Sequence, residues 1–355
     1  MAAIEMITRR QHRCSIQIQQ DILRNENLLK KVFQKKRKLL IVTDVNVAER
    51  YLEQVAEKLR PYATQVDSFV LPADEQAKTL FFAEKIIDFL DNHSYTRTDN
   101  MLALGGGVIG DSAGFCASVY RRGMGFIQMP TTLLAQVDSS IGGKTALNTA
   151  EGKNRLGTVS QPNWILIDPL FLKSLSREQY LYGFAEIIKY AVVMDAALFD
   201  YLEKTPLQAI EQNIFRLVEC CVRHKINVVA EDELDHGKRM ILNFGHSVAH
   251  AVETLYGYDL FSHGQAVSLG MYAMATFGEQ QGLTKPGSAE KIKKVLQKFE
   301  LPFTMPVLNK QNLFHAMKND KKSQGDTIKE VIVSEIGTAK ITEMPFSIIE
   351  EIATR

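Results

Sequence analysis

The stretch LNFGHSVAHAVETLYGYDLFSH, from Leu242 to His263, contains three of the chain's eight histidines. His246 and His250 are four residues apart, so on a helix they share one face. Upstream, Glu186 lies in an otherwise apolar helical segment. Two imidazoles and one carboxylate are a common ligand set for a catalytic zinc that keeps a position open. The stretch therefore indicates a metal site, although such a histidine pair is also common on surfaces and in cores. It lacks the glutamate of the zinc-protease motif HExxH.

The first half of the chain alternates short apolar runs with helical segments. We predict strands at 14–19, 38–44, 66–71, 100–104, 125–130 and 163–168. Helices are expected between them, at 48–59, from about 79 to 89, and at 113–120. Alternation of this kind predicts a parallel sheet with helices on both faces.

The pattern changes near residue 175, after which helices dominate. We predict helices at 177–194, 207–232, 242–256, 264–281, 288–299, 310–319 and 347–353. Only 330–334 and 338–342 have the pattern of strands, joined as a hairpin. The predicted fold is thus α/β plus all-α, with a Rossmann-like parallel-sheet domain over 1–175 and a helical domain over 176–355.

Composition is that of an ordinary soluble globular protein. The chain has 355 residues, 45% hydrophobic and 23% charged, with a net charge of +1. This balance indicates neither a nucleic-acid nor an acidic-membrane partner. No CxxC occurs, and we expect reduced thiols at Cys14, Cys116, Cys220 and Cys221. The first thirty residues lack a signal-peptide core and no apolar run could span a bilayer, so the expected location is the cytoplasm.

A glycine-rich turn follows the predicted strand at 100–104. Its sequence, GGGVIG at 105–110, fits GxGxxG. Such a turn brings backbone N–H groups and a helix N-terminus close to a pyrophosphate, so we interpret it as a dinucleotide site. The acidic ribose ligand is not at the usual spacing, and Glu75 or Asp44 are the alternatives. A tight structural turn is the alternative explanation of the glycines.

The segment 130–144, PTTLLAQVDSSIGGK, gathers hydroxyls, glycines, a lysine and the carboxylate of Asp138. This composition is typical of a loop that binds phosphates or hydroxyls. Its spacing does not match the Walker motif. Asn148, Lys153 and Asn154 extend the polar set. A purely structural loop is the alternative.

Together these motifs resemble the 3-dehydroquinate synthase family. The matches are GGGVIGD at 105–111, PTTLLAQVDSSIGGKT at 130–145, GKN at 152–154, QP at 161–162, AEIIKY at 185–190, LNFGHSVAH at 242–250, HG at 263–264 and DKK at 320–322. They run in the family's order across nearly the whole chain, so the joint match is far more specific than any one motif. The resemblance implies an NAD-binding α/β domain, a helical metal-binding domain and a homodimer.

The resemblance also implies a role for individual residues. Glu186, His246 and His263 would hold one divalent metal, zinc or cobalt, and His250 would face substrate instead. The residues expected to bind NAD are Asp44, Glu75, Lys78, Gly107, Val108, Ile109, Gly110, Asp111, Thr131, Thr132, Lys144, Lys153 and Ser174. Those expected to line the substrate pocket are Asp138, Lys144, Lys153, Asn154, Lys189, Lys225, Arg239, Asn243 and His250. Arg122 of a second subunit, with Lys321 or Lys322, would hold the phosphate.

The implied reaction belongs to the shikimate pathway of aromatic amino-acid biosynthesis. It converts the sugar phosphate 3-deoxy-D-arabino-heptulosonate 7-phosphate into 3-dehydroquinate and phosphate. Hydride passes to NAD, phosphate leaves by β-elimination, the hydride returns, and an aldol step closes the ring. The metal would polarise the oxidised hydroxyl, and Arg239 would bind the carboxylate. The alternatives are a sister sugar-phosphate cyclase, a metal-dependent polyol dehydrogenase and a catalytically silent homologue.

Overall fold

A computed structural model of the chain describes residues 12–150, 152–256, 260–305, 327–345, 348 and 352. The predicted helix at 310–319 and the two predicted phosphate ligands Lys321 and Lys322 lie outside these ranges, as does most of the predicted helix at 347–353. Among the described helices, none is both long and apolar enough to cross a membrane.

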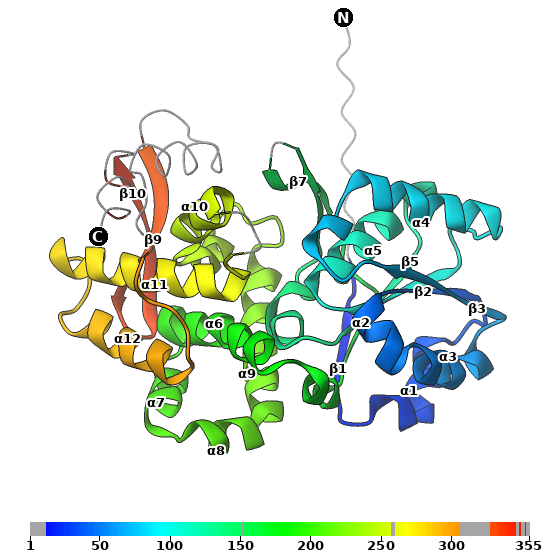
Figure 1. Cartoon of the computed structure of the whole chain (residues 1–355), viewed down its shortest axis with the longest axis horizontal. Helices are drawn as coiled ribbons and strands as arrows, with labels where there is room; N and C mark the ends of the chain where they lie inside the picture. The colour runs from blue at the N-terminus through cyan, green and yellow to red at the C-terminus, as the bar shows by residue number, and fades with distance from the viewer. Residues whose placement is uncertain are drawn as a thin grey trace, which may run out of the picture.

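A six-stranded parallel sheet forms the centre of the N-terminal half (Figure 1). Its order is β1-β8-β5-β4-β2-β3, and every neighbouring pair is parallel. The strands are β1 Ser15–Ile18, β2 Lys38–Asp44, β3 Gln65–Leu71, β4 Asn100–Gly105, β5 Gly125–Pro130 and β8 Trp164–Ile167. The inner strands are continuous apolar runs, because helices cover both faces of the sheet. The predicted Rossmann-like sheet is confirmed.

The helices of this half are α1 Glu26–Val32, α2 Val45–Val47, α3 Glu53–Leu59, α4 Leu80–Asn92 and α5 Gly107–Val119. Helix α5 begins at the glycines themselves, six residues before the predicted start. Strand β2 lies between β3 and β4, so the chain order reverses there. Ligands of open parallel sheets bind outside the carboxyl ends of the strands at such a point. Here those ends carry Asp44 and Gly105.

The structure corrects our interpretation of 130–144 as a loop. Residues Ala135–Ser139 form a π-helical turn, which begins where the Thr132 hydroxyl accepts a hydrogen bond from the Ala135 N–H. Leu133, Val137 and Ile141 recur every four residues and are buried in the helical core, so their apolar spacing overrides the polar content. An unpredicted antiparallel hairpin follows, formed by β6 Lys144–Thr149 and β7 Gly152–Val159.

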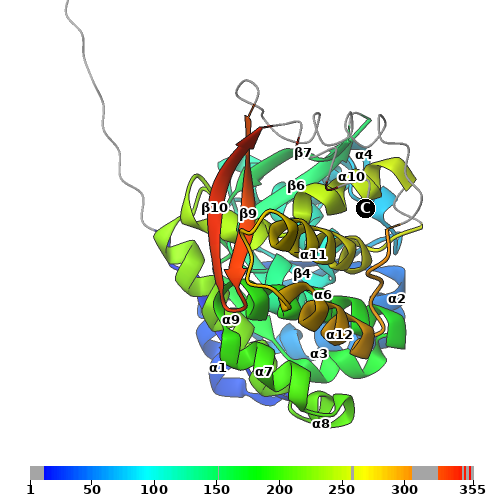
Figure 2. The ribbon, with the colours of Figure 1, turned by 90° about the vertical axis from the view of Figure 1, so that its left-hand side faces the viewer.

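Helices dominate the C-terminal half, as predicted. They are α6 Arg177–Met194, α7 Ala196–Lys204, α8 Leu207–Gln212, α9 Ile214–Glu231, α10 His246–Tyr256, α11 His263–Gln280 and α12 Ser288–Lys298. The predicted hairpin is present as β9 Thr327–Glu335 and β10 Thr338–Pro345, with β9 alongside α11 (Figure 2). The structure adds α7, whose first turn is capped by Asp195.

Two predicted helices are interrupted. The segment 207–232 is two helices that meet at Asn213. The segment 242–256 becomes α-helical only at His246, after a 3-10 turn over Lys238–Asn243. Gly245 has a φ of +77°, and a side chain there would meet the Met271 amide nitrogen at 2.6 Å. This glycine therefore ends the turn and sets where α10 begins.

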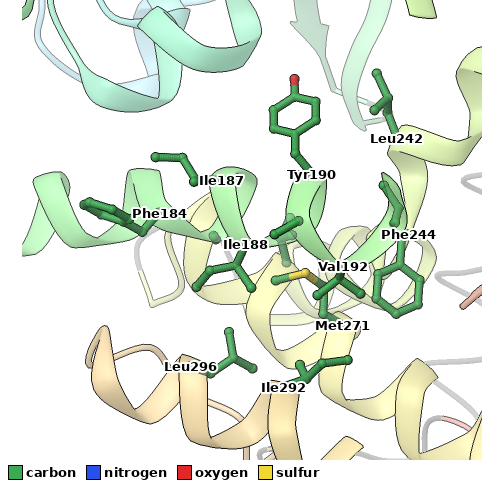
Figure 3. Close-up of a cluster of buried hydrophobic side chains, with 14 of the residues drawn as sticks. Phe184, Ile187, Ile188, Tyr190, Val192, Leu242, Phe244, Met271, Ile292 and Leu296 are labelled. Carbon is green, nitrogen blue, oxygen red and sulfur yellow. The ribbon is translucent and has the colours of Figure 1, made fainter. Parts of the chain in front are cut away.

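Helix α6 runs through the middle of the helical core. Its apolar residues Phe184, Ile188 and Val192 pack among side chains from α11, α12 and the segment before α10, whereas the Tyr190 hydroxyl points away from this cluster (Figure 3). Two ionisable residues of the same helix, Glu186 and Lys189, are 0% and 2% exposed. Charges at such depth are costly unless they are paired or bind a ligand.

Candidate active site

Three helices bring a carboxylate and two imidazoles together. Glu186 lies in the middle of α6, and His246 and His263 are the first residues of α10 and α11. Glu186 Oε1 is 3.7 Å from His246 Nε2 and 3.5 Å from His263 Nε2. Glu186 also contacts the Lys189 ammonium, yet neither carboxylate oxygen accepts a well-formed hydrogen bond from the described residues. A buried carboxylate facing two imidazole nitrogens in this way fits a divalent cation.

Two of the three groups, Glu186 and His246, are already in the protonation state that binds a cation. Burial opposes ionisation of Glu186, but the Lys189 ammonium and both imidazoles lower its pKa, so it is a carboxylate. Burial and the Lys189 charge lower the pKa of His246 to about 3, which keeps this imidazole neutral. Burial alone would lower the pKa of His263, but the carboxylates of Glu186 and Glu253 raise it to about 10. A metal would therefore displace a proton from His263 on binding.

His250 does not belong to this group of three. Its ring lies 5.7 Å from that of His246, one turn further along α10. A second group of potential ligands, Asp195, Cys220 and His224, lies elsewhere. In it, His224 Nε2 is 2.7 Å from Asp195 Oδ2, and Oδ1 caps α7. We interpret that group as a structural hydrogen-bonded cluster.

Buried cations surround Asp138 beside the candidate metal group. Asp138 Oδ1 is 2.9 Å from Lys225 Nζ and accepts a 2.6 Å hydrogen bond from the Tyr190 hydroxyl. Burial opposes ionisation of Asp138, but the Lys225 and Lys189 ammonium groups hold its pKa well below the usual range. Burial lowers the pKa of Lys225 in turn. The cluster is thus an ionised acid paired with Lys225 and stabilised further by the charge of Lys189.

Arg239 approaches from the 3-10 turn before α10 and is 3% exposed. Its Nη1 donates to the carbonyl oxygens of Gly142, at 3.1 Å, and Glu233, at 2.6 Å. Among the described residues, the other guanidinium nitrogens donate no hydrogen bond. Asn243 ends the same turn and is half-buried. Arg239 is therefore rigidly held while part of its planar donor face is left for a ligand.

A cavity of about 600 Å³ extends from the strand ends to His263, one of the three candidate metal ligands. Eight of the thirteen residues predicted to bind NAD line it, and the far end is formed by Ser262 and His263. Those eight are Asp44, Glu75, Gly107, Val108, Ile109, Thr131, Thr132 and Ser174. The start of α5 opens into the cavity, so the α5 N-terminus can face an anionic group there.

The hydroxyls and acids around this cavity differ in the hydrogen bonds that they already make within the protein. Asp44 accepts hydrogen bonds from two backbone N–H groups of α2, whereas Glu75 accepts one from the Asn148 amide. Burial raises the pKa of Asp44. Ser174 donates to the Phe171 carbonyl. The buried hydroxyl of Thr131 has no hydrogen-bond partner among the described residues.

Four further predicted residues lie on the β6–β7 side of the site: Lys78, Asp111, Lys153 and Asn154. Lys78 lies 2.5 Å from both Asp111 Oδ2 and Asn154 Oδ1. Burial raises the pKa of Asp111, in opposition to the Lys78 charge. Lys153 is 3.3 Å from Glu253 and 3.9 Å from Glu75.

Two predicted residues lie in more open positions. Lys144 pairs with Asp235, although its side chain is half exposed. Arg122 is exposed on the turn after α5, with a φ of +66°, and its role across a subunit interface stays a prediction.

Sequence reasoning missed three side chains at this site: Glu253, Asp235 and Tyr190. Glu253 contacts both His263 and Lys153, and it stands seven residues after His246 on the same helical face. That spacing could have revealed it. No signal in the sequence pairs Asp235 with Lys144, because the two are far apart in the chain.

Two family sequence models match consecutive parts of the chain. The one described as 3-dehydroquinate synthase N-terminal matches residues 68–182, and the one described as 3-dehydroquinate synthase C-terminal matches 183–323. A 3-dehydroquinate synthase of Enterococcus faecalis is 43% identical over 310 residues, 87% of each chain. The chain belongs to the 3-dehydroquinate synthase family. Another family member, from Streptococcus pneumoniae, is 41% identical over 334 residues, 93% of this chain and 94% of the relative.

Solved structures agree with this family fold. A 2-epi-5-epi-valiolone synthase from Streptomyces hygroscopicus, with NAD⁺ and Zn²⁺ bound, has a TM-score of 0.89 and 29% identity over 98% of both chains. A 2-deoxy-scyllo-inosose synthase, complexed with carbaglucose-6-phosphate, NAD⁺ and Co²⁺, has a TM-score of 0.86 at 22% identity over 96% of both. The second likeness shows the shared fold alone.

Proposed function

We propose that the chain converts 3-deoxy-D-arabino-heptulosonate 7-phosphate into 3-dehydroquinate and phosphate, using catalytic NAD and one divalent metal. The observation that carries the proposal is the buried carboxylate of Glu186, which faces His246 and His263, while His263 also lines the cavity into which the α5 N-terminus opens. Such an arrangement would let a nicotinamide in the cavity meet a hydroxyl bound to the metal. Membership of the family supports the same reaction.

Glu186, His246 and His263 would hold the metal, zinc or cobalt. Once bound, the metal would polarise the hydroxyl to be oxidised, and NAD would accept a hydride and later return it. The α5 N-terminus would face the pyrophosphate, and Thr131 has a free hydroxyl for the cofactor. We favour Glu75 over Asp44 as ribose ligand, because Asp44 already caps α2 through two backbone hydrogen bonds.

The buried cations would hold the substrate. Arg239 presents free guanidinium donors and would bind the substrate carboxylate in a bidentate manner. Lys189 and Lys225 would face its oxygen atoms, with Asp138 ionised between them. His250, one turn from His246, would exchange a proton with the sugar ring, since its imidazole adjoins the metal group without belonging to it.

The test is phosphate release from 3-deoxy-D-arabino-heptulosonate 7-phosphate with NAD and zinc, while absorbance reports NADH. The proposal predicts phosphate release that needs both NAD and metal, dehydroquinate as product, and no accumulation of NADH. A chelator should stop the reaction, and added zinc or cobalt should restore it. Net NADH would indicate a polyol dehydrogenase instead.

The second candidate is a sister sugar-phosphate cyclase. The observation that favours it is the 0.89 TM-score with the 2-epi-5-epi-valiolone synthase. The two functions differ in whether the substrate carries a carboxylate, so buried Arg239 discriminates between them. Turnover of a sugar phosphate that lacks the carboxylate, with none of 3-deoxy-D-arabino-heptulosonate 7-phosphate, would select the sister cyclase.

We also propose a cytoplasmic homodimer in which Arg122 and one of Lys321 or Lys322 bind the phosphate. Four free cysteines suit a reducing compartment. Exposed Arg122 is available to a second subunit. Light scattering would give the mass of the assembly. Mixing an Arg122→Ala chain with a chain inactive through Glu186→Gln should restore activity only if Arg122 acts across the interface.

A further inference from the structure

Glu253 is a buried acid that the proposed reaction does not use. It lies on α10 and is 3% exposed. Its Oε1 is 3.5 Å from His263 Nδ1, on the side of the ring opposite the Nε2 that faces Glu186. A carboxylate on the second nitrogen of a ligating histidine fixes the ring orientation and makes the ligand more basic. Glu253 therefore stands where it can hold His263 toward a metal.

The same carboxylate oxygen has a second partner from the other half of the molecule. Lys153 belongs to β7, and the β6–β7 hairpin projects toward α10 (Figure 1). Its ammonium donates to Glu253 Oε1 at 3.3 Å and lies 3.9 Å from Glu75 Oε1 in the cofactor cavity. Lys153 thus lies between two acids: Glu75 in the candidate NAD site, and Glu253, which contacts the candidate metal ligand His263.

We propose that Glu253 is a positioning residue for the metal ligand His263, and that Lys153 holds Glu253 in this position from the NAD-binding half. The inference rests on the proposed function, since it takes Glu186, His246 and His263 as the metal ligands. Metal affinity then depends on a lysine that touches no metal. Lys153 would influence the metal through Glu253, so its contribution to metal affinity should vanish when Glu253 is absent.

The experiment measures metal affinity by competition with a chromogenic chelator, using Zn²⁺ and Co²⁺ on the full-length protein. We expect Glu253→Ala to weaken metal binding by about 10–100-fold, as for other outer-shell partners. Lys153→Met should weaken it several-fold, and adding Lys153→Met to Glu253→Ala should cause no further loss. Glu253→Gln keeps an oxygen acceptor and should recover part of the affinity. The visible spectrum of bound Co²⁺ should change in Glu253→Ala, because the ligand geometry changes.

Matched controls are Glu290→Ala on α12 and Lys340→Met on β10, both exposed. Melting of the metal-free variants separates misfolding from weak binding. Metal affinity of Glu253→Ala and Glu253→Gln within twofold of wild type overturns the inference, as does an additive effect of Lys153→Met. Failure of wild type to bind metal, or retention of binding in Glu186→Gln, overturns the proposed metal site and this inference together.

Discussion

Replacing Tyr190 by phenylalanine tests whether Asp138 is an ionised acid inside the protein. Tyr190 is fully buried, and its hydroxyl donates a 2.6 Å hydrogen bond to Asp138 Oδ1. Burial and the Asp138 charge raise the pKa of Tyr190 well above its usual value, so it remains a donor. Phenylalanine keeps the ring and its packing. A hydrogen bond to a charged group contributes about 1.5–3 kcal/mol, and we expect Tyr190→Phe to lower the free energy of unfolding by that amount at pH 7.

The assay is equilibrium denaturation in urea of metal-free protein, followed by circular dichroism. The matched control is Tyr180→Phe on the same helix, because the Tyr180 hydroxyl makes no hydrogen bond within the described residues. If the loss in free energy of unfolding of Tyr190→Phe lay within about 0.5 kcal/mol of the loss in the control, an ionised, hydrogen-bonded Asp138 would be contradicted. A hydrogen bond to a charged group is expected to contribute several times that difference.

The pH dependence gives a second check on the same variant. The pKa of Asp138 is lowered in the folded protein, so its contribution is present above the unfolded value of about 3.9 and is lost as pH falls further, through the folded pKa. The deficit of Tyr190→Phe should therefore be constant from about pH 5 to 8 and shrink only in stronger acid. A deficit that varies with a midpoint near neutrality would point to a histidine instead.

Three further substitutions test the metal, the carboxylate site and the fold. Glu186→Gln should abolish metal binding and activity, and metal content after dialysis would show it. The loss should exceed the roughly 10–100-fold decrease that follows replacement of an outer-shell partner, because Glu186 is a direct ligand in the proposal. Arg239→Lys should lower kcat/KM by about 10–100-fold through a raised KM, because a bidentate charged contact is lost. Gly245→Ala should lower the free energy of unfolding by more than about 1 kcal/mol, because φ is +77° there, and calorimetry would show it.

The sheet was predictable because its strands are buried on both faces and bounded by polar residues. Lys38–Asp44 forms β2 with the predicted limits. The helix limits were less predictable where tertiary contacts decide them. Nothing local in the sequence says that Gly245 must approach the Met271 backbone, and this contact delays the start of α10 until His246.

The site was only partly predictable for a similar reason. The spacing of His246 and His250 alone indicated a metal site that uses both. The family resemblance implied Glu186, His246 and His263, and the geometry groups these three. The i,i+4 rule relates residues within one helix, whereas the candidate cation site lies where the three helices α6, α10 and α11 meet. The β6–β7 hairpin escaped prediction because its strands are largely polar and are exposed or half-buried, apart from Leu147 and Thr145, which are buried.

The β9–β10 hairpin makes the centre of the helical half depend on the end of the chain. Its turn residue Gly337 donates a hydrogen bond to the Val192 carbonyl of α6, and Ile332 packs in the same core as α6. Translation adds about 5–20 residues per second, so synthesis of β10 is complete roughly 7–30 s after synthesis of α6. Until then the hairpin cannot cover α6. During that interval the apolar side chains of α6 are open to chaperones or to aggregation. Ribosomes that stall before β10 should therefore yield a nascent chain with a sheet domain able to fold and a helical half that is not.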